Sequence, residues 1–155
     1  MQEVILLKCG EIVLKGLNRY KFEAKLVRDL KRKLAPSGNF EVTLKQSTIC
    51  VFPAEGADID RALEISRRIF GVVSVSRAAV CEKNIDEIKR TAQEYLVPQL
   101  RHTSSFKVVA RRSDTRFPLT SPQIGAEVGG ALLEKCPHLK VKMDEPEVTV
   151  RVEVR

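Results

Sequence analysis

Arginine and lysine side chains gather in residues 105–130, and these are the groups in the chain best suited to binding an anion. Lys107 and Arg111 belong to a segment of alternating apolar and polar residues that predicts a strand, and Arg112 and Arg116 lie in the basic loop predicted after it, residues 112–118. A guanidinium group makes forked hydrogen bonds to phosphate oxygens. The stretch therefore predicts a phosphate-facing surface, and RNA is the partner that we favour.

A helix is expected directly after this loop. Ser121 is predicted as its N-cap and Pro122 as its first helical residue, where the missing N–H of proline costs nothing. The free N–H groups and the dipole at such a helix start favour an anion. Ser121 therefore joins the arginines as a predicted RNA contact.

The net charge of the chain is +7, and most of it comes from two stretches. Residues 1–33 carry a net +5, residues 101–116 carry +4, and the rest of the chain carries −2. Clustered positive charge is what a polyanion-binding protein needs, although charge runs also serve only to solubilise a surface. The clustering favours nucleic acid over solubility alone.

The first half of the chain predicts the order β-α-β-β-α-β. Asn18 and Asp58 are suitable N-caps for its two helices. This order is typical of a ferredoxin-like unit, in which two helices lie on one face of an antiparallel sheet. We expect strands at 3–9, 40–45, 48–52 and 72–80, and helices at 19–34 and 59–70.

The second half predicts a helix from Asn84 to about Leu96, closed by Pro98, and then the strand, loop and helix described above. Gly125 and Gly129 would leave a smooth helix face against which another backbone packs; close approach of a phosphate is the alternative. Residues 148–154 alternate valine with polar residues and predict a last strand. The predicted fold class is α/β (α+β), with domains at 1–78 and 79–155.

Catalytic patterns are missing from the sequence. His102 and His138 lie in no recognisable catalytic motif, the four cysteines form no Cys-x-x-Cys pair, and no phosphate-binding glycine loop occurs. We therefore expect no catalytic residue and no metal site in these residues. No apolar run approaches the roughly 20 residues that cross a bilayer, and the first residues lack a signal-peptide pattern, so a cytoplasmic protein without membrane attachment is expected.

A second pattern precedes the first helix, in residues 10–19: Gly-Glu-Ile-Val-Leu-Lys-Gly-Leu-Asn-Arg. Most of it reads as local architecture, because glycine permits a turn and Asn18 caps the helix. Lys15 and Arg19 lie near that helix start and are predicted to contact backbone phosphate.

These two motifs resemble a known family. The run at 10–19 is similar to the N-terminal ferredoxin-like domain of the tRNA 4-thiouridine synthetases, the ThiI proteins. Three later stretches resemble the THUMP domain that follows it in the family. They are Phe106-Lys-Val, Arg112-x-Asp-x-Arg-Phe-Pro-x-x-Ser with the two later glycines, and Asp144-x-Pro with the closing valines. THUMP domains also occur in RNA methyltransferases and in a deaminase family. The first motif is what points to ThiI.

The resemblance implies a tRNA-binding portion that holds the acceptor arm and 3′ end. Uridine 8 would then be thiolated by a C-terminal ATP-pyrophosphatase domain using ATP and Mg²⁺, with a cysteine desulfurase as sulfur donor and a link to thiamine thiazole synthesis. The nucleotide loop of that domain has no counterpart in these residues. With the domain boundary that is usual in the family, the THUMP domain would start nearer residue 58.

Two positions depart from the family pattern. The family commonly has lysine where Thr115 stands, and an amide where Glu145 precedes a proline. Two alternatives to the sulfurtransferase reading stay open: a THUMP module serving a methyltransferase, and a ferredoxin-like dimerisation or sensor module without RNA binding. A homodimer is also left open.

Overall fold

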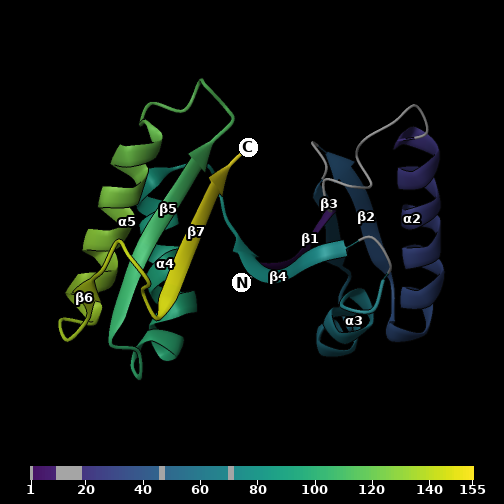
Figure 1. The fold of residues 1–155 in the computed structure, drawn as a ribbon, viewed down its shortest axis with the longest axis horizontal. Coiled ribbons are helices and arrows are strands. Elements are labelled where there is room, and N and C mark those ends of the chain that lie inside the picture. Colours follow the sequence, from purple (N-terminus) through teal and green to yellow (C-terminus); the bar gives the residue numbers. More distant parts are fainter. Residues whose placement is uncertain (1, 10–18, 46–47, 70–71) are drawn as a thin grey trace. The chain divides into compact units, whose positions relative to one another are not determined.

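The computed structural model describes residues 2–9, 19–45, 48–69 and 72–155 (Figure 1). By internal packing the chain divides into two compact units, Met1–Val80 and Cys81–Arg155. Within the described residues, each unit combines one sheet with two α-helices. The predicted mixed α/β class is therefore confirmed.

The first unit has a four-stranded sheet in the order β2-β3-β1-β4, with every neighbouring pair antiparallel. This confirms the ferredoxin-like arrangement, in which the two central strands are the first and third along the chain. A short 3-10 turn, Ala35–Ser37, separates the first helix from β2. The elements are β1 Gln2–Cys9, α2 Arg19–Leu34, β2 Phe40–Lys45, β3 Thr48–Pro53, α3 Ile59–Ser66 and β4 Val72–Val80.

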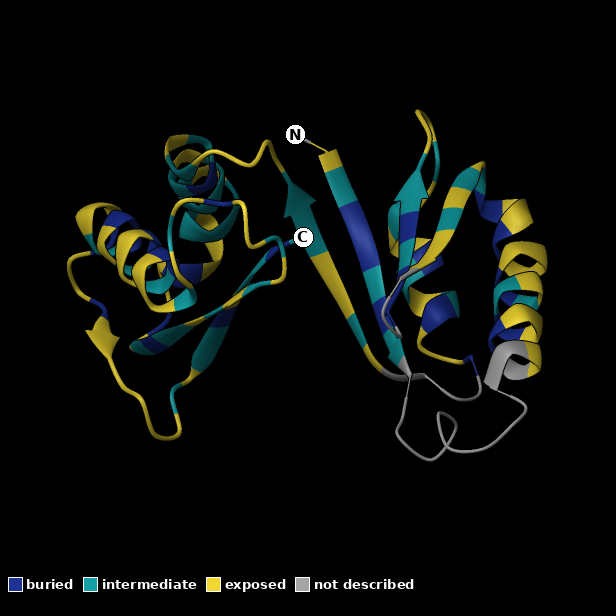
Figure 2. Ribbon diagram, turned by 90° about the horizontal axis from the view of Figure 1, so that it is seen from above, coloured by how far each residue is buried: buried dark blue, intermediate teal, exposed yellow. Residues whose placement is uncertain are grey.

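The core of this unit lies between α2, α3 and the central strands. Ile5 and Leu7 of β1 and Ile49 of β3 are fully buried against Leu30 of α2. Full burial of one such side chain contributes about 1.5–3 kcal/mol. The buried stripe of α2 repeats every four residues, and Figure 2 shows it as the dark side of that helix.

The second helix of this unit begins as predicted and ends early. The Asp58 carboxylate accepts a hydrogen bond from the Arg61 N–H at 3.1 Å, as an N-cap does. α3 then stops at Ser66, short of the predicted end at residue 70. The Ser66 hydroxyl donates to the Ala62 carbonyl at 2.7 Å, a bond that competes with continuation of the helix.

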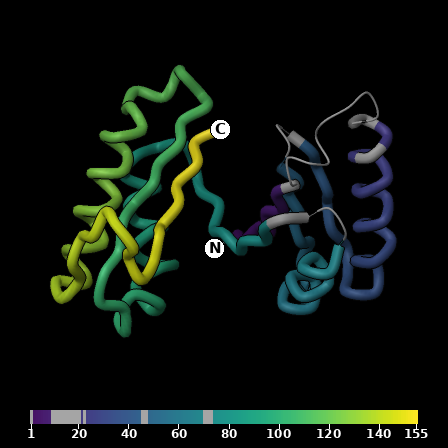
Figure 3. The backbone as a smooth tube through the Cα atoms, viewed as in Figure 1, coloured from purple at the N-terminus to yellow at the C-terminus, as the bar shows by residue number. Residues whose placement is uncertain are grey.

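The second unit is built on a three-stranded parallel sheet in the order β6-β5-β7. Figure 3 shows the chain leaving β5, crossing the loop 113–120 and returning as α5. Lys140–Val141 forms a very short strand, so β5 has a full neighbour only on the β7 side. The elements are α4 Ile85–Leu100, β5 Ser105–Arg112, α5 Ser121–Lys135, β6 Lys140–Val141 and β7 Val148–Val154.

Helix α4 runs past the proline that was predicted to end it. Asn84 caps the helix as expected, accepting hydrogen bonds from the N–H groups of Asp86 and Glu87, but Pro98 lies inside the last turn and the helix ends at Leu100. Proline there removes one backbone hydrogen bond. Leu100 is 1% exposed in the core, and this burial offsets the loss.

Helix α5 packs directly on β5, with Phe106 and Ile124 among the buried residues between them. The two glycines face β5: a Cβ at Gly125 would lie 3.7 Å from the Val108 carbonyl oxygen, and one at Gly129 would lie 3.7 Å from a Val108 methyl group, both ordinary van der Waals distances. At Gly125 the neighbour is the backbone of β5, as expected, and at Gly129 it is the Val108 side chain. One face of the sheet is thereby covered and the other is left for the polar side chains.

Candidate nucleic-acid interface

The uncovered face of the second sheet carries the alternate residues of β5 and β7. We call it the outer face. Successive side chains of a strand point to opposite faces, so Phe106, Val108 and Ala110 lie toward α5 and the residues between them lie away from it. Parallel pairing aligns Lys107 with Thr149, Val109 with Arg151, and Arg111 with Glu153 along the outer face.

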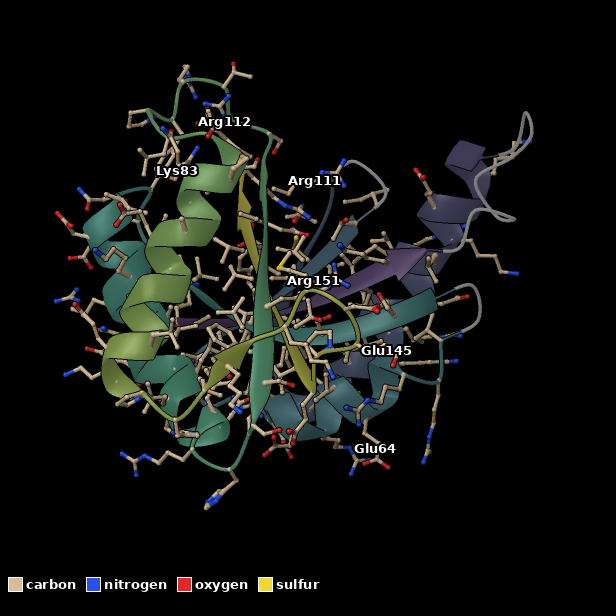
Figure 4. All side chains as sticks on the ribbon, turned by 60° about the vertical axis from the view of Figure 1, so that its left-hand side comes forward. Glu64, Lys83, Arg111, Arg112, Glu145 and Arg151 are labelled. Atoms are coloured by element: carbon tan, nitrogen blue, oxygen red, sulfur yellow. The ribbon has the colours of Figure 1, made fainter. Side chains whose placement is uncertain are left out.

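Two guanidinium groups on the outer face have no ion pair among the residues that the structure describes. Arg111 and Arg151 are exposed, and Figure 4 shows both on the side of β5 and β7 that faces away from α5. Glu153 is opposite Arg111 in register, but its carboxylate accepts hydrogen bonds from Arg155 at 2.6 and 3.0 Å. Within the described ranges neither Arg111 nor Arg151 has an ion pair.

Several other basic groups in the described residues are paired with acids. Arg77 donates to both carboxylate oxygens of Glu3 at 2.5 and 2.9 Å and to Asp60 at 2.7 Å, and these hydrogen bonds raise the pKa of Arg77. Lys89 is 3.1 Å from the Glu127 carboxylate. In contrast to these paired groups, Arg111 and Arg151 are two neighbouring cations on one face whose guanidinium groups are exposed to an anion.

Lys107 lies on the same face and is tied to the turn after β6. Its ammonium group donates to the Met143 carbonyl at 3.4 Å, and the side chain is half-buried. An ammonium has three N–H donors, so this contact leaves two of them for an anion.

Arg112 points the other way and closes the loop. Its Nη1 donates to the carbonyl oxygens of Phe117 at 2.9 Å and Leu119 at 3.2 Å, and the side chain is half-buried. Its backbone N–H donates to the Ser121 hydroxyl at 3.0 Å. Arg112, which was predicted to contact RNA, therefore holds the loop 113–120 against the end of β5.

Arg116 is held by Asp114 in the same loop. The Asp114 carboxylate accepts from the Lys83 ammonium at 2.8 Å and from the Nε and backbone N–H of Arg116 at 3.1 Å each. The hydrogen bond from Lys83, followed by those from Arg116, holds the pKa of Asp114 well below its usual range, and the pKa of Arg116 is raised in turn. The Arg116 side chain stays 87% exposed, so its remaining donors face solvent.

The start of α5 differs from the prediction by one residue. Thr120 is the N-cap: the Gln123 N–H donates to its hydroxyl at 3.4 Å, and the Thr120 N–H donates to the Gln123 side chain at 2.9 Å. This is a capping box, and its Thr-x-x-Gln spacing is visible in the sequence. Ser121 is wrong as an N-cap, because it is the first helical residue and its hydroxyl accepts from Arg112 instead.

The remaining predicted contacts belong to the first unit. Lys15 lies outside the described residues. Arg19 is the first residue of α2, and only its backbone is among the described parts of the chain. The structure therefore brings Lys107 and Arg111 together on one face and separates Arg112 from them. Arg151 was missed, because only the β5–β7 register places it beside Val109.

Metal ligation and membrane insertion are two further features to consider for the described ranges. Nowhere in them do three or more His, Cys, Asp or Glu side chains form a group that could hold a metal ion. No helix in them has the length and apolarity needed to span a bilayer.

Comparison with known proteins places both halves of the chain. Residues 4–76 match the family model of the ThiI ferredoxin-like domain, and residues 82–155 match that of the THUMP domain. A "Probable tRNA sulfurtransferase" of Acetivibrio thermocellus is 37% identical over 158 residues, which is 100% of this chain and 40% of that protein. The chain thus spans about 40% of the length of this curated relative.

Two solved structures share the fold over the whole chain. The crystal structure of PH1313 from Pyrococcus horikoshii Ot3 superposes with a TM-score of 0.85 at 26% identity, covering 100% of this chain and 51% of that one. A crystal structure of a 4-thiouridine synthetase–RNA complex with bound ATP gives a TM-score of 0.82 at 24% identity, covering 100% and 39%. With both family models matched in order, the chain belongs to the ThiI family, of which it forms the ferredoxin-like and THUMP region.

Proposed function

We propose that this chain is the tRNA-binding portion of a tRNA uridine 4-sulfurtransferase. It would hold the acceptor arm and 3′ end of tRNA while uridine 8 reaches a catalytic domain beyond these residues. The observation that carries the proposal is the pair of exposed guanidinium groups on the outer face of the THUMP sheet, Arg111 and Arg151, which have no ion pair within the described ranges. Membership of the ThiI family supports it.

Contacts to the RNA backbone are what this face is suited to make. Arginine pairs with phosphate through forked hydrogen bonds, and such contacts position a nucleic acid without reading its sequence. The chain has six Phe, two Tyr and no Trp, so extensive stacking of bases on aromatic rings is not expected. Shape and phosphate spacing would therefore select the acceptor arm.

The rest of the proposed reaction lies with groups outside these residues. The catalytic domain would bind ATP and Mg²⁺, and a cysteine desulfurase would supply the sulfur. We also propose a cytoplasmic protein and a link between its sulfur transfer and thiamine synthesis. The part of this chain is to bind and orient tRNA.

The proposal is tested by measuring tRNA binding against salt concentration for the wild type and for Arg111→Glu/Arg151→Glu. Each phosphate contact contributes about 0.7–0.9 to the slope of log K against log salt, so losing two contacts flattens the slope by about 1.4–1.8. Arg90→Glu is the control, because Arg90 is exposed on α4 of the same unit and its ion pair is with Glu87 of the same helix.

We expect the control to keep the wild-type slope and the double variant to lose both slope and affinity. Gel filtration of the wild type accompanies the binding assay. A protein that dimerises and is indifferent to tRNA at every salt concentration would refute the proposal and favour a dimerisation or sensor module.

A further inference from the structure

One acidic side chain stands among the cations of β5 and the loop 113–120. Asp114 is the only Asp or Glu between Lys107 and Thr120, a stretch that also holds Arg111, Arg112 and Arg116. A carboxylate at this place lowers the local positive potential, so by charge alone it opposes the binding of a polyanion. Its presence in a surface that we propose to bind RNA therefore needs a physical explanation.

The Asp114 carboxylate is held by donors from two segments of the chain. The side chain is only 12% exposed. Its Oδ2 accepts from the Lys83 ammonium at 2.8 Å, and its Oδ1 accepts from the backbone N–H and the Nε–H of Arg116 at 3.1 Å each. Lys83 belongs to the segment just before α4, so that segment fixes one oxygen of the carboxylate while the loop binds the other.

The contact with Asp114 occupies one edge of the Arg116 guanidinium. Nε and Nη2 form that edge, and the Nη2–Oδ2 distance is 3.5 Å. A guanidinium has five N–H donors, and those of Nη1 together with the second of Nη2 form another forked edge. Such an edge pairs with two phosphate oxygens. Because the Arg116 side chain is 87% exposed, this second edge faces solvent.

The backbone of the loop is anchored by groups other than this carboxylate. Phe117 is buried in the core, and the Arg112 guanidinium donates to two carbonyls of the loop. What the carboxylate adds is a constraint on the Arg116 side chain. Without that constraint, Arg116 would keep its place in the loop while its long side chain would sample many rotamers.

We infer that Asp114 is a positioning residue, which holds the Arg116 guanidinium in an orientation that binds a phosphate of the RNA. Lys83 fixes the carboxylate that does so. The inference rests on the proposed function and gives it a residue whose charge alone would oppose RNA binding. A long side chain that is already ordered avoids an ordering cost on binding, which corresponds to about two- to tenfold in Kd.

The competing account is that Asp114 blocks Arg116 and that RNA must displace the carboxylate. The two accounts predict opposite results for Asp114→Asn. If the carboxylate competes with RNA, its removal tightens binding. If it positions Arg116, its removal weakens binding although the protein gains positive charge. The geometry favours positioning, because the edge that faces Asp114 and the edge that faces solvent are different.

The test is a double-mutant cycle of tRNA binding with Asp114→Asn, Arg116→Ala and the two together. It is run at about 0.15 M salt, where a Debye length of about 8 Å limits the reach of a simple change in charge. We expect Asp114→Asn to weaken binding about two- to tenfold in the wild-type background. In the Arg116→Ala background it should cause no further loss, because the side chain on which it acts is absent. Glu94→Gln removes one negative charge from an exposed position on α4 of the same unit, and this control should not weaken binding.

NMR of the protein without RNA gives an independent measure. The Nε–H signal of Arg116, assigned by its loss in Arg116→Ala, should exchange slowly with solvent in wild type and rapidly in Asp114→Asn. The backbone amides of residues 113–120 should exchange at similar rates in both proteins, because other groups anchor the loop.

Three results would overturn the inference and leave RNA binding at the outer face intact. They are tighter binding by Asp114→Asn, an equal loss of binding in both backgrounds, and faster exchange of the backbone amides throughout the loop, which would show a purely structural role. Failure of the wild type to bind tRNA would remove the proposed function and this inference with it.

Discussion

Neighbouring arginines at the end of β5 should behave in opposite ways when each is replaced by methionine. Arg112→Met removes the two hydrogen bonds to the Phe117 and Leu119 carbonyls, at 2.9 and 3.2 Å. Arg111→Met removes an exposed cation that has no ion pair within the described residues. Methionine keeps much of the apolar stem of arginine, so the comparison isolates the guanidinium group.

The size of the effect follows from the two bonds. A hydrogen bond to a charged group contributes about 1.5–3 kcal/mol, and water replaces part of that at a half-buried site. We therefore expect Arg112→Met to lower the free energy of unfolding of the second unit by about 2–4 kcal/mol. Arg111→Met should change it by no more than about 0.5 kcal/mol, as exposed substitutions do, while weakening RNA binding.

Hydrogen exchange in increasing urea, read on peptides from residues 105–135, separates the second unit from the first. tRNA binding is measured on the same samples. If Arg112→Met unfolds at the wild-type urea concentration and loses as much RNA affinity as Arg111→Met, then Arg112 contacts RNA and our account of the loop is wrong. Equal stability with unchanged binding in both variants would contradict both assignments.

Three further predictions concern stability. Because the pKa of Asp114 is lowered in the folded protein, its carboxylate stabilises the fold fully at neutral pH, and this contribution is lost as the pH falls below about 4 toward the lowered pKa. The difference in melting temperature between wild type and Asp114→Asn should therefore shrink on acidification. A constant difference would contradict this. Gly38→Ala should destabilise the first unit by about 1–3 kcal/mol in urea unfolding, because φ is +128° and the new Cβ would lie 2.8 Å from a backbone atom of Ala57, whereas the control Gly56→Ala, with φ +80° and open space, should cost less. Phe106→Ala should cost about 3–5 kcal/mol by leaving a cavity, and a loss no larger than that of Val109→Ala on the outer face would refute its core position.

Much of the fold was predictable from local patterns. The periods of 3.6 and 2 placed the helices and strands, and the β-α-β-β-α-β order together with the two motifs indicated the ferredoxin-like and THUMP halves. Local signals failed where two patterns competed. Thr120 and Ser121 both suit an N-cap, and the local capping box with Gln123 selects Thr120. Pro98 normally ends a helix, but α4 continues to Leu100, which is buried in the core.

The same distinction between local patterns and contacts across the fold applies to the candidate site. Alternation along the chain was enough to put Lys107 and Arg111 on one face, because it depends only on the geometry of a single strand. Strand register and contacts between separate segments decide three other features. They are the position of Arg151 beside these two residues, the use of Arg112 inside its own loop and the open edge of β5. Those contacts form only when the chain folds, since no local preference specifies which residue on another strand or loop becomes the partner.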